Sequence, residues 1–217
     1  MKNLFTILFT VVALFSNAQF IKKLSIDVNI GGRFGGAVSD TVILDKSASL
    51  SPGIHVDGGV RYQLSDLISV RGGLSYDGFK TTLGESTDKA GLISGSVEAI
   101  VNLKSIKFMS FIPEKIGLNF HAGFGLSTMA NPSFKKSFED NNIEFADPGL
   151  KGNDDMVNIV LGLTPQYKLN DKISINLDLS TKLLVKQSLY VNASQDSRLN
   201  ETTGNIINVA VGATYKF

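Results

Sequence analysis

Apolar and polar residues alternate with a period of two over eight segments of the chain, which predicts eight β-strands. In the last segment, the odd positions from Ile207 to Phe217 are apolar or aromatic, and the even positions are small or polar. Ile100, Thr181 and Leu184 are exceptions to the alternation. The predicted strands occupy residues 24–34, 54–63, 68–77, 93–103, 116–127, 157–167, 173–186 and 207–217. No segment of comparable length shows helical spacing, so we expect an all-β domain.

The connections between the predicted strands differ in length in a regular way. Two are short turns, Ser65-Asp66 and Asn170-Asp171, made of turn-forming residues. Four are long, at 38–51, 80–91, 128–155 and 187–203, and the connection at 104–115 is intermediate. An outer-membrane barrel alternates long outer loops with short periplasmic turns, and strands of about 10 to 14 residues can cross a bilayer when tilted. We therefore predict an eight-stranded antiparallel up-and-down transmembrane β-barrel, with both mature termini in the periplasm.

The N-terminal residues have the pattern of a secretory signal peptide. Lys2 is followed by an apolar run over 4–15 and then by the small-residue segment Ser16-Asn17-Ala18. A retained anchor helix is the alternative, but a run of about a dozen residues is shorter than the roughly 20 that span a membrane. We predict that residues 1–18 are cleaved and that 19–217 form the barrel domain, located in the outer membrane of a Gram-negative bacterium.

The same alternation would fit a soluble, lipocalin-like barrel with its apolar face inside. Residue size therefore has to decide which face points into the barrel. One face consists almost entirely of Leu, Ile, Val and aromatic residues, whereas the other is rich in Gly, Ser and Asn. An eight-stranded barrel has a narrow interior, which suits the second set. Tyr62, Tyr76, Tyr167 and Tyr215 lie near predicted strand ends, where they suit an interfacial girdle. These features favour the membrane barrel.

The amino-acid composition limits which partners the protein can bind and which chemistry it can carry out. The 21 glycines and 5 prolines fit strands and turns. Without Lys2, the 21 basic residues become 20 and equal the 20 acidic ones, so no charge excess indicates nucleic acid. The chain has no cysteine, which excludes disulfides, thiolate metal sites and thiol catalysis.

The polar face carries a nearly balanced set of charged residues and two histidines. We predict a lumenal polar network of Asp27, Arg33, His55, Asp57, Arg61, Arg71, Glu98, His121, Asp178 and Lys182. Asp77 is a further charged residue on the inward face. In a narrow lumen these groups must pair, because an isolated buried charge is costly. The favoured interpretation is a polar plug that fills the barrel. The alternative is a gated pathway for small solutes, whose conductance would depend on Arg61, Arg71 and Glu98.

The sequence gives little support for a catalytic, cofactor or metal site. Asp57 could orient His55 as a general base, but no motif singles out a nucleophilic serine, so we predict no catalytic residue. We also find no phosphate-binding glycine loop and no dinucleotide motif. Asp147, Asp154 and Asp155 lack the ligand spacing of a calcium loop. The longest loop also contains Phe134, Phe138 and Phe145, which could anchor a partner or pack as a lid over the barrel mouth.

The terminal segment 207–217, ending in Tyr215-Lys216-Phe217, resembles the C-terminal signal by which outer-membrane barrels are recognised by their assembly machinery. Together with the eight predicted strands, the chain resembles the OmpA transmembrane domain and the OmpX type of small barrel. The resemblance implies contact with outer-membrane lipids and with the barrel assembly machinery. It also implies a non-enzymatic role in envelope integrity, or in presenting the four long loops to a surface or membrane partner. It includes no peptidoglycan-binding domain, so we expect no cell-wall tethering.

Overall fold

The computed structural model describes residues 18–34, 41–43, 46–50, 52–83, 86–109, 111–130, 153–187 and 202–217. Residues 1–17, most of the predicted signal peptide, lie outside this part. The elements are α2 (Ala18–Ile21), β1 (Leu24–Phe34), β2 (Thr41–Ile43), β3 (Lys46–Leu50), β4 (Gly53–Gln63), β5 (Ile68–Leu83), β6 (Ser86–Asn102), the 3₁₀ turns η1 (Leu103–Ser105) and η2 (Lys107–Met109), β7 (Ile116–Ala130), β8 (Asn153–Lys168), β9 (Ile173–Gln187) and β10 (Thr202–Lys216). No helix in the described ranges is both long and apolar enough to cross a membrane.

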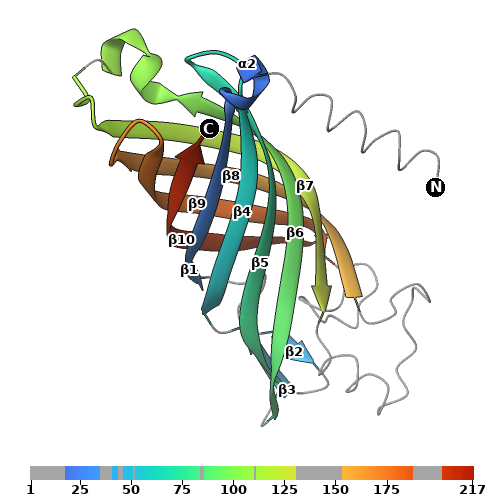
Figure 1. The fold of residues 1–217 in the computed structure, drawn as a ribbon. Helices are drawn as coiled ribbons and strands as arrows, with labels where there is room; N and C mark the ends of the chain where they lie inside the picture. Colours follow the sequence, from blue (N-terminus) through green and yellow to red (C-terminus); the bar gives the residue numbers. More distant parts are fainter. Residues whose placement is uncertain are drawn as a thin grey trace, which may run out of the picture.

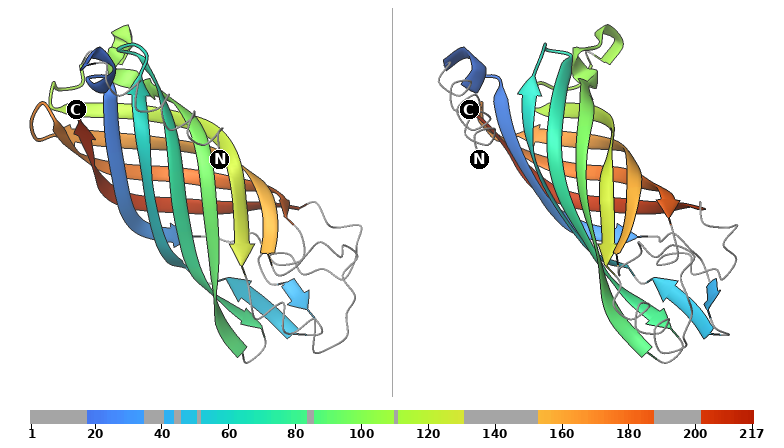
Figure 2. Two further views of the ribbon diagram at one scale, coloured as in Figure 1. Left: turned by 45° about the vertical axis from the view of Figure 1, so that its right-hand side comes forward. Right: turned by 90° about the vertical axis from the view of Figure 1, so that its right-hand side faces the viewer.

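Eight long strands form one closed antiparallel barrel (Figures 1 and 2). Around the ring the order is β5, β4, β1, β10, β9, β8, β7 and β6, and β6 pairs with β5 again. Closure depends on the first and last strands, which pair from Ser25 opposite Lys216 to Phe34 opposite Ile207. Because every strand has two neighbours, the backbone hydrogen bonds are satisfied within the sheet, as a bilayer requires. The predicted eight-stranded up-and-down barrel is confirmed.

The two ends of the barrel differ. One end carries α2, the C-terminus and the short turns at 64–67 and 169–172 (Figure 1). Both predicted turns are present there: Ser65 Oγ accepts the Ile68 amide at 3.0 Å, and Asn170 Oδ1 accepts the Ile173 amide at 2.9 Å. The connection predicted at 104–115 lies at this end as well and contains η2. The opposite end, which we call the outer end, carries β2, β3 and the extended ends of β5 and β6.

The strands are longer than predicted at the outer end, so the predicted loop boundaries there are wrong. β5 and β6 stay paired as far as Leu83 opposite Ser86, through most of the segment expected as a loop at 80–91. The segment expected as a loop at 38–51 contains β2 and β3, and β3 pairs with the extension of β5. Strand also extends into both ends of 128–155 and 187–203, whereas 131–152 and 188–201 lie outside the described residues. Residues 78–83 and 86–91 do not alternate between apolar and polar, so the period-two pattern does not reach these strand ends, which are paired through their backbones.

The apolar face of the sheet points outward and the polar face points into the lumen. Leu74 and Leu126 are each 71% exposed, whereas Asp77 and Asn158 are 0% exposed. Among the residues that the structure describes, twenty buried residues are polar or charged and ten are apolar, which is the reverse of a soluble core. Ile100 and Leu184, which break the alternation, are buried inside the barrel. This arrangement contradicts the lipocalin-like alternative.

The predicted tyrosine girdle is only partly correct. Tyr62, Tyr167 and Tyr215 lie at the end that carries the short turns, and Tyr62 stacks on Phe20 with ring centroids 4.8 Å apart. Tyr76 is not near a strand end, because β5 continues seven residues past it to Leu83. It still faces outward and is 46% exposed.

Candidate functional site

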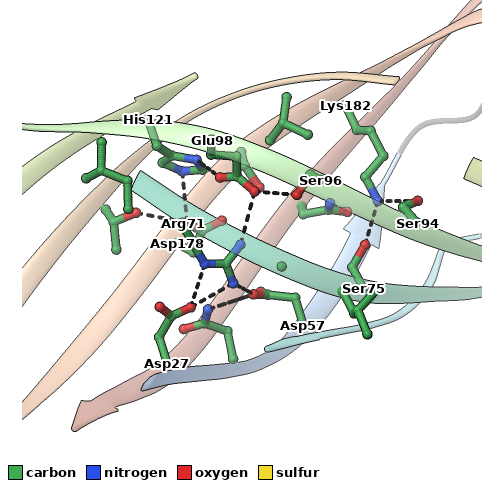
Figure 3. A pocket seen from close by; sticks show the side chains of 18 of the residues that line it. Asp27, Asp57, Arg71, Ser75, Ser94, Ser96, Glu98, His121, Asp178 and Lys182 are labelled. Carbon is green, nitrogen blue, oxygen red and sulfur yellow. Dashed lines mark hydrogen bonds and ion pairs between the residues drawn. The ribbon is translucent and has the colours of Figure 1, made fainter. Parts of the chain in front are cut away.

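The lumen brings together the charged residues that alternation placed on the inward face (Figure 3). The structure places the ten predicted network residues, and also Asp77, in the barrel on β1, β4, β5, β6, β7 and β9. Arg33 and Asp77 are fully buried, and of these eleven residues all except Arg61 are at most 9% exposed. They form two connected clusters, one around Arg71 and one around Lys182.

Arg71 on β5 is the centre of the first cluster. Its Nε donates to Asp27 Oδ2 at 2.8 Å and its Nη1 donates to Glu98 Oε1 at 3.0 Å, while Nη2 donates to Asp57. Each carboxylate comes from a different strand, so one planar guanidinium joins β1, β4, β5 and β6. Arginine suits this position because its donors form a rigid fork.

Two inward glycines provide the space for the Arg71 side chain. Gly59 and Gly73 lie directly opposite each other on β4 and β5. A Cβ atom would lie 2.5 Å from Arg71 Nε at position 59 and 2.6 Å from Nη1 at position 73. Any larger residue at either position would therefore displace the guanidinium from its three carboxylates.

His121 on β7 continues the first cluster toward β9. Its Nδ1 lies 2.8 Å from Glu98 Oε2, and its Nε2 is in ion-pair contact with Asp178 Oδ2 at 3.1 Å. Glu98 also accepts from Ser96 Oγ at 2.6 Å, and Asp178 accepts from Thr164 Oγ1 at 2.9 Å. Glu98 thus links Arg71 to His121.

Lys182 on β9 is the centre of the second cluster. Its Nζ donates to Asp77 Oδ2 at 2.7 Å, to Ser75 Oγ at 2.9 Å and to Ser94 Oγ at 3.1 Å. β9 lies four strands from β5 in the ring of eight, so Lys182 spans the lumen from wall to wall. His55 joins this cluster to the first, with Nδ1 at 2.6 Å from Asp77 Oδ1 and Nε2 at 3.3 Å from Asp57 Oδ2.

The charges in the lumen nearly cancel. Five carboxylates (Asp27, Asp57, Asp77, Glu98 and Asp178) face four permanent cations (Arg33, Arg61, Arg71 and Lys182), and each histidine lies between two carboxylates. Arg61 is held more loosely than Arg71 and Lys182, with Nη2 3.8 Å from Asp27 Oδ1. The side chains leave a cavity of about 50 Å³, which is room for a few water molecules and too little for an organic solute.

A buried apolar layer lies in the lumen near the outer end, and the sequence analysis missed it. It consists of Leu92, Met129, Met156, Leu184 and Ile206, none of them more than 3% exposed. They lie on β6 to β10, and Leu92 is directly opposite Met129. Four of the five fall outside the predicted strands, which ended too early. Of the five, the sequence analysis singled out only Leu184, as an exception to the alternation.

The two histidines and the acidic residues of the described ranges do not form a catalytic or metal site. Both ring nitrogens of His55 and His121 face carboxylates, so neither imidazole is directed at a serine hydroxyl. In the part of the chain that the structure describes, no three His, Asp or Glu side chains are arranged to hold a metal ion. Of the loop residues considered for partner or calcium binding, Phe134, Phe138, Phe145 and Asp147 lie outside the described residues. Asp155 is an exposed residue of β8.

No protein-family model matches the chain, and no curated protein matches it. Solved structures do resemble it. Neisserial surface protein A aligns over 90% of this chain and 97% of its own, with 13% sequence identity and a TM-score of 0.53. The outer membrane protein OprG from Pseudomonas aeruginosa aligns over 93% and 99%, with 12% identity and a TM-score of 0.49. The N-terminal β-barrel domain of OprF from the same organism aligns over 89% and 97%, with 15% identity and a TM-score of 0.40. The likeness to Neisserial surface protein A and the closed ring of eight strands give the chain the fold of small eight-stranded outer-membrane barrels, as its resemblance to the OmpA and OmpX type predicted.

Proposed function

We propose that this protein is an integral outer-membrane barrel with a closed, polar lumen and no enzymatic activity. Its role would be structural, or would consist of presenting the segments at its outer end to a surface or membrane partner. The observation that carries the proposal is the lumenal network, in which Arg71 holds three carboxylates and Lys182 crosses the lumen to Asp77. A network of this kind fills the barrel with paired charges, and the remaining cavity of about 50 Å³ has room for a few water molecules.

The proposal of a closed lumen has a second support in the apolar layer near the outer end. Leu92 and Leu184 are 0% exposed, on strands that lie on different sides of the ring. Apolar side chains cannot replace the hydration shell of an ion, so an apolar layer opposes ion passage. The runner-up function, a narrow channel for small solutes, would require both this layer and the charged clusters to open.

We infer the absence of enzymatic activity from the contacts that the ring nitrogens of the two histidines make. A general base needs one ring nitrogen within hydrogen-bond reach of the proton that it takes. Both nitrogens of His55 and Nδ1 of His121 are hydrogen-bonded to carboxylates, and His121 Nε2 lies 3.1 Å from Asp178 Oδ2. Asp57 was considered as the residue that orients His55. It contacts Arg71 and Asn29 in addition to His55, and is therefore a member of the network.

Planar-bilayer conductance of the refolded chain tests the closed lumen. Unheated and boiled samples should first migrate differently on a denaturing gel, which establishes that the barrel is folded. We expect a folded barrel with no steady openings. Steady, charge-selective openings that change in Arg61→Gln, Arg71→Gln or Glu98→Gln, and not in Lys115→Gln at the rim, would establish the channel instead.

Labelling of intact cells tests the orientation. An epitope inserted between Leu83 and Ser86, at the tip of the β5–β6 ribbon, should be accessible to antibody without permeabilisation. The same epitope inserted in the turn at 169–172 should become accessible only after the outer membrane is opened. The reverse pattern would place the outer end in the periplasm and remove the surface role.

A further inference from the structure

Lysines gather at one end of the barrel, the end that carries the short turns, which we call the turn end (Figure 1). Eight lysines and three acidic residues lie in the segments that form this end, which are 18–23, 64–67, 102–116, 168–172 and 216–217. The acidic residues are Asp66, Glu114 and Asp171. Residues 19–217 as a whole contain equal numbers of basic and acidic residues. The charge is therefore unevenly distributed, and the turn end is positive.

Four of these lysines form two pairs across neighbouring strands. The Lys168 amide donates to the Lys115 carbonyl oxygen at 2.8 Å, which places these residues opposite each other at the ends of β8 and β7. The Lys216 amide donates to the Lys172 carbonyl oxygen at 2.8 Å, which does the same at the ends of β10 and β9. Like charges directly opposite on neighbouring strands repel each other, so each pair is unfavourable without an anion.

The two pairs belong to one continuous row. Lys168 pairs with the β9 residue two positions after Lys172, so these two lysines are diagonal neighbours. Lys216 pairs with the β1 residue two positions after Lys23, which is its diagonal neighbour. The strands β7, β8, β9, β10 and β1 are consecutive in the ring, so the row runs around about half of the rim. With about 5 Å between opposite and about 7 Å between diagonal side chains, it is about 25 Å long. We call Lys23, Lys115, Lys168, Lys172 and Lys216 the lysine arc.

The lysine arc lies on the lumen side of the wall. Each of its members continues the inward row of its strand, two positions from Ser25, Gly117, Gln166, Ser174 or Thr214. The adjacent positions on the outward rows are apolar or aromatic and 37% to 47% exposed, and they are Ile116, Tyr167, Ile173 and Tyr215. With Tyr62, the last of these form a tyrosine row (Tyr62, Tyr167 and Tyr215) at the level of the headgroups. At this level lipid meets the outward side chains, and the lysines surround the mouth of the lumen.

The lysine arc has no counter-charge among the residues that the structure describes. All five side chains are exposed, and within those ranges none of them forms an ion pair or a side-chain hydrogen bond. The polar layer beneath the arc is neutral. Gln166 Nε2 donates to Asn176 Oδ1 at 3.0 Å, and Asn176 Nδ2 donates to Thr214 Oγ1 at 2.8 Å. The charge of the arc is therefore not balanced from inside the barrel.

Lys104 at the same end shows the contacts of a lysine that has a structural role. Its Nζ donates to the carbonyl oxygens of Pro113 and Ile116, at 2.7 Å and 3.3 Å. These bonds fasten the connection before β7, and the side chain is half-buried. The five lysines of the arc make no comparable contacts in the described ranges, so their ammonium groups are available to a ligand outside the chain.

The spacing of the arc fits the carboxylates of an extended acidic peptide. In an extended chain every second side chain points the same way, at intervals of about 7 Å. The arc offers ammonium groups at intervals of about 5 Å and about 7 Å. An extended segment of about eight residues covers its length of about 25 Å. A lipid phosphate fits less well, because the side chains that meet lipid at this level are isoleucines and tyrosines.

We propose that the lysine arc is a docking surface for an extended acidic segment of a partner protein, with carboxylates at alternate positions. Under the orientation proposed above, this partner lies in the periplasm. The surface is at the opposite end from the segments proposed to meet an external partner, so it is a second interaction site. A barrel that conducts in the planar-bilayer experiment would leave this inference intact.

Fluorescence anisotropy of a labelled peptide tests the proposal. The peptide alternates Glu with Ser and is long enough to span the arc, and a matched peptide alternates Gln with Ser. Each is titrated with the folded chain in nonionic detergent at low salt, where exposed ion pairs are least screened. We expect saturable binding of the Glu peptide that weakens as salt is added, and no binding of the Gln peptide.

Variants of the arc locate the binding site. Lys168→Gln with Lys172→Gln should weaken binding of the Glu peptide about tenfold, since each exposed ion pair contributes up to about fivefold. Lys168→Arg with Lys172→Arg keeps the charges and should retain binding. Lys22→Gln with Lys107→Gln is the matched control, because it removes two exposed lysines of the same end that lie outside the arc, and it should have a much smaller effect. All variants should first pass the gel test for folding.

Three results would overturn the proposal. Equal loss in the two Gln double variants would mean that binding follows the overall charge of the turn end. Equal binding of the Gln peptide would mean that carboxylates are not recognised. The third uses native mass spectrometry with phosphatidylglycerol, which we expect the arc variants to retain as the unaltered chain does. Loss of this lipid from Lys168→Gln with Lys172→Gln, with binding of the Glu peptide unchanged, would make an anionic lipid the ligand instead.

Discussion

His121 and Gly162 lie directly opposite each other on β7 and β8, and the imidazole of His121 occupies the space that a side chain at position 162 would need. A Cβ atom on residue 162 would lie 2.2 Å from His121 Nε2. The ring holds the carboxylates of Glu98 and Asp178 on its two sides, so this glycine is part of the polar network although it carries no polar side chain.

Gly162→Ala is therefore expected to displace the imidazole and to lower the free energy of unfolding by about 1–3 kcal/mol, the usual cost of overpacking. Urea unfolding of the refolded barrel, followed on unheated gels, measures the change. Gly72→Ala is the matched control: it lies in the same sheet, a Cβ atom there meets nothing within 4 Å, and its effect should stay within about 0.5 kcal/mol. Equal effects of the two substitutions would show that His121 does not need the space.

Removing the Arg71 side chain should be the most damaging single change in the lumen. Arg71→Met leaves Asp27, Asp57 and Glu98 without their shared cation, and breaking a buried pair from one side costs about 3–5 kcal/mol. The measurement is again the urea midpoint of the refolded barrel. Adding Asp57→Asn and Glu98→Gln to Arg71→Met should restore part of the loss. If the triple variant is less stable than Arg71→Met, the cost does not come from uncompensated carboxylates.

A substitution on the outer wall tests which face meets lipid. Val211 on β10 is 57% exposed and lies four positions from Tyr215 of the tyrosine row, well inside the apolar band. Val211→Arg should lower the free energy of unfolding in lipid vesicles by about 2–4 kcal/mol, because an arginine near the midplane must leave water. Leu169→Arg, in an exposed turn at the rim, should cost about 0–1 kcal/mol. Similar costs at the two positions would contradict the membrane placement.

The terminal aromatic residue is predicted to act in assembly rather than in stability. Phe217 is 43% exposed, and its ring contacts Tyr215 edge to face with centroids 5.2 Å apart. Phe217→Ala should reduce the heat-modifiable protein recovered from outer membranes of expressing cells, while the purified chain refolds normally. Phe111→Ala, which changes a more exposed aromatic in the connection before β7, is the control and should accumulate normally. Normal accumulation of Phe217→Ala would remove the assembly signal.

The sequence by itself determined the barrel, because a wall with lipid on one side and a narrow lumen on the other needs a strict alternation of apolar and polar residues. Eight strands, the inward position of every network residue and the turns at Ser65 and Asn170 all followed from that alternation. The ends of β5 and β6 did not follow, because residues 78–83 and 86–91 do not alternate between apolar and polar although their backbones pair. The tertiary structure alone decided which charges pair: that Lys182 reaches Asp77 across the lumen depends on closure of the ring and on the stagger of its strands. Alternation assigns each residue to a face but says nothing about its height in the barrel or its neighbours across the lumen.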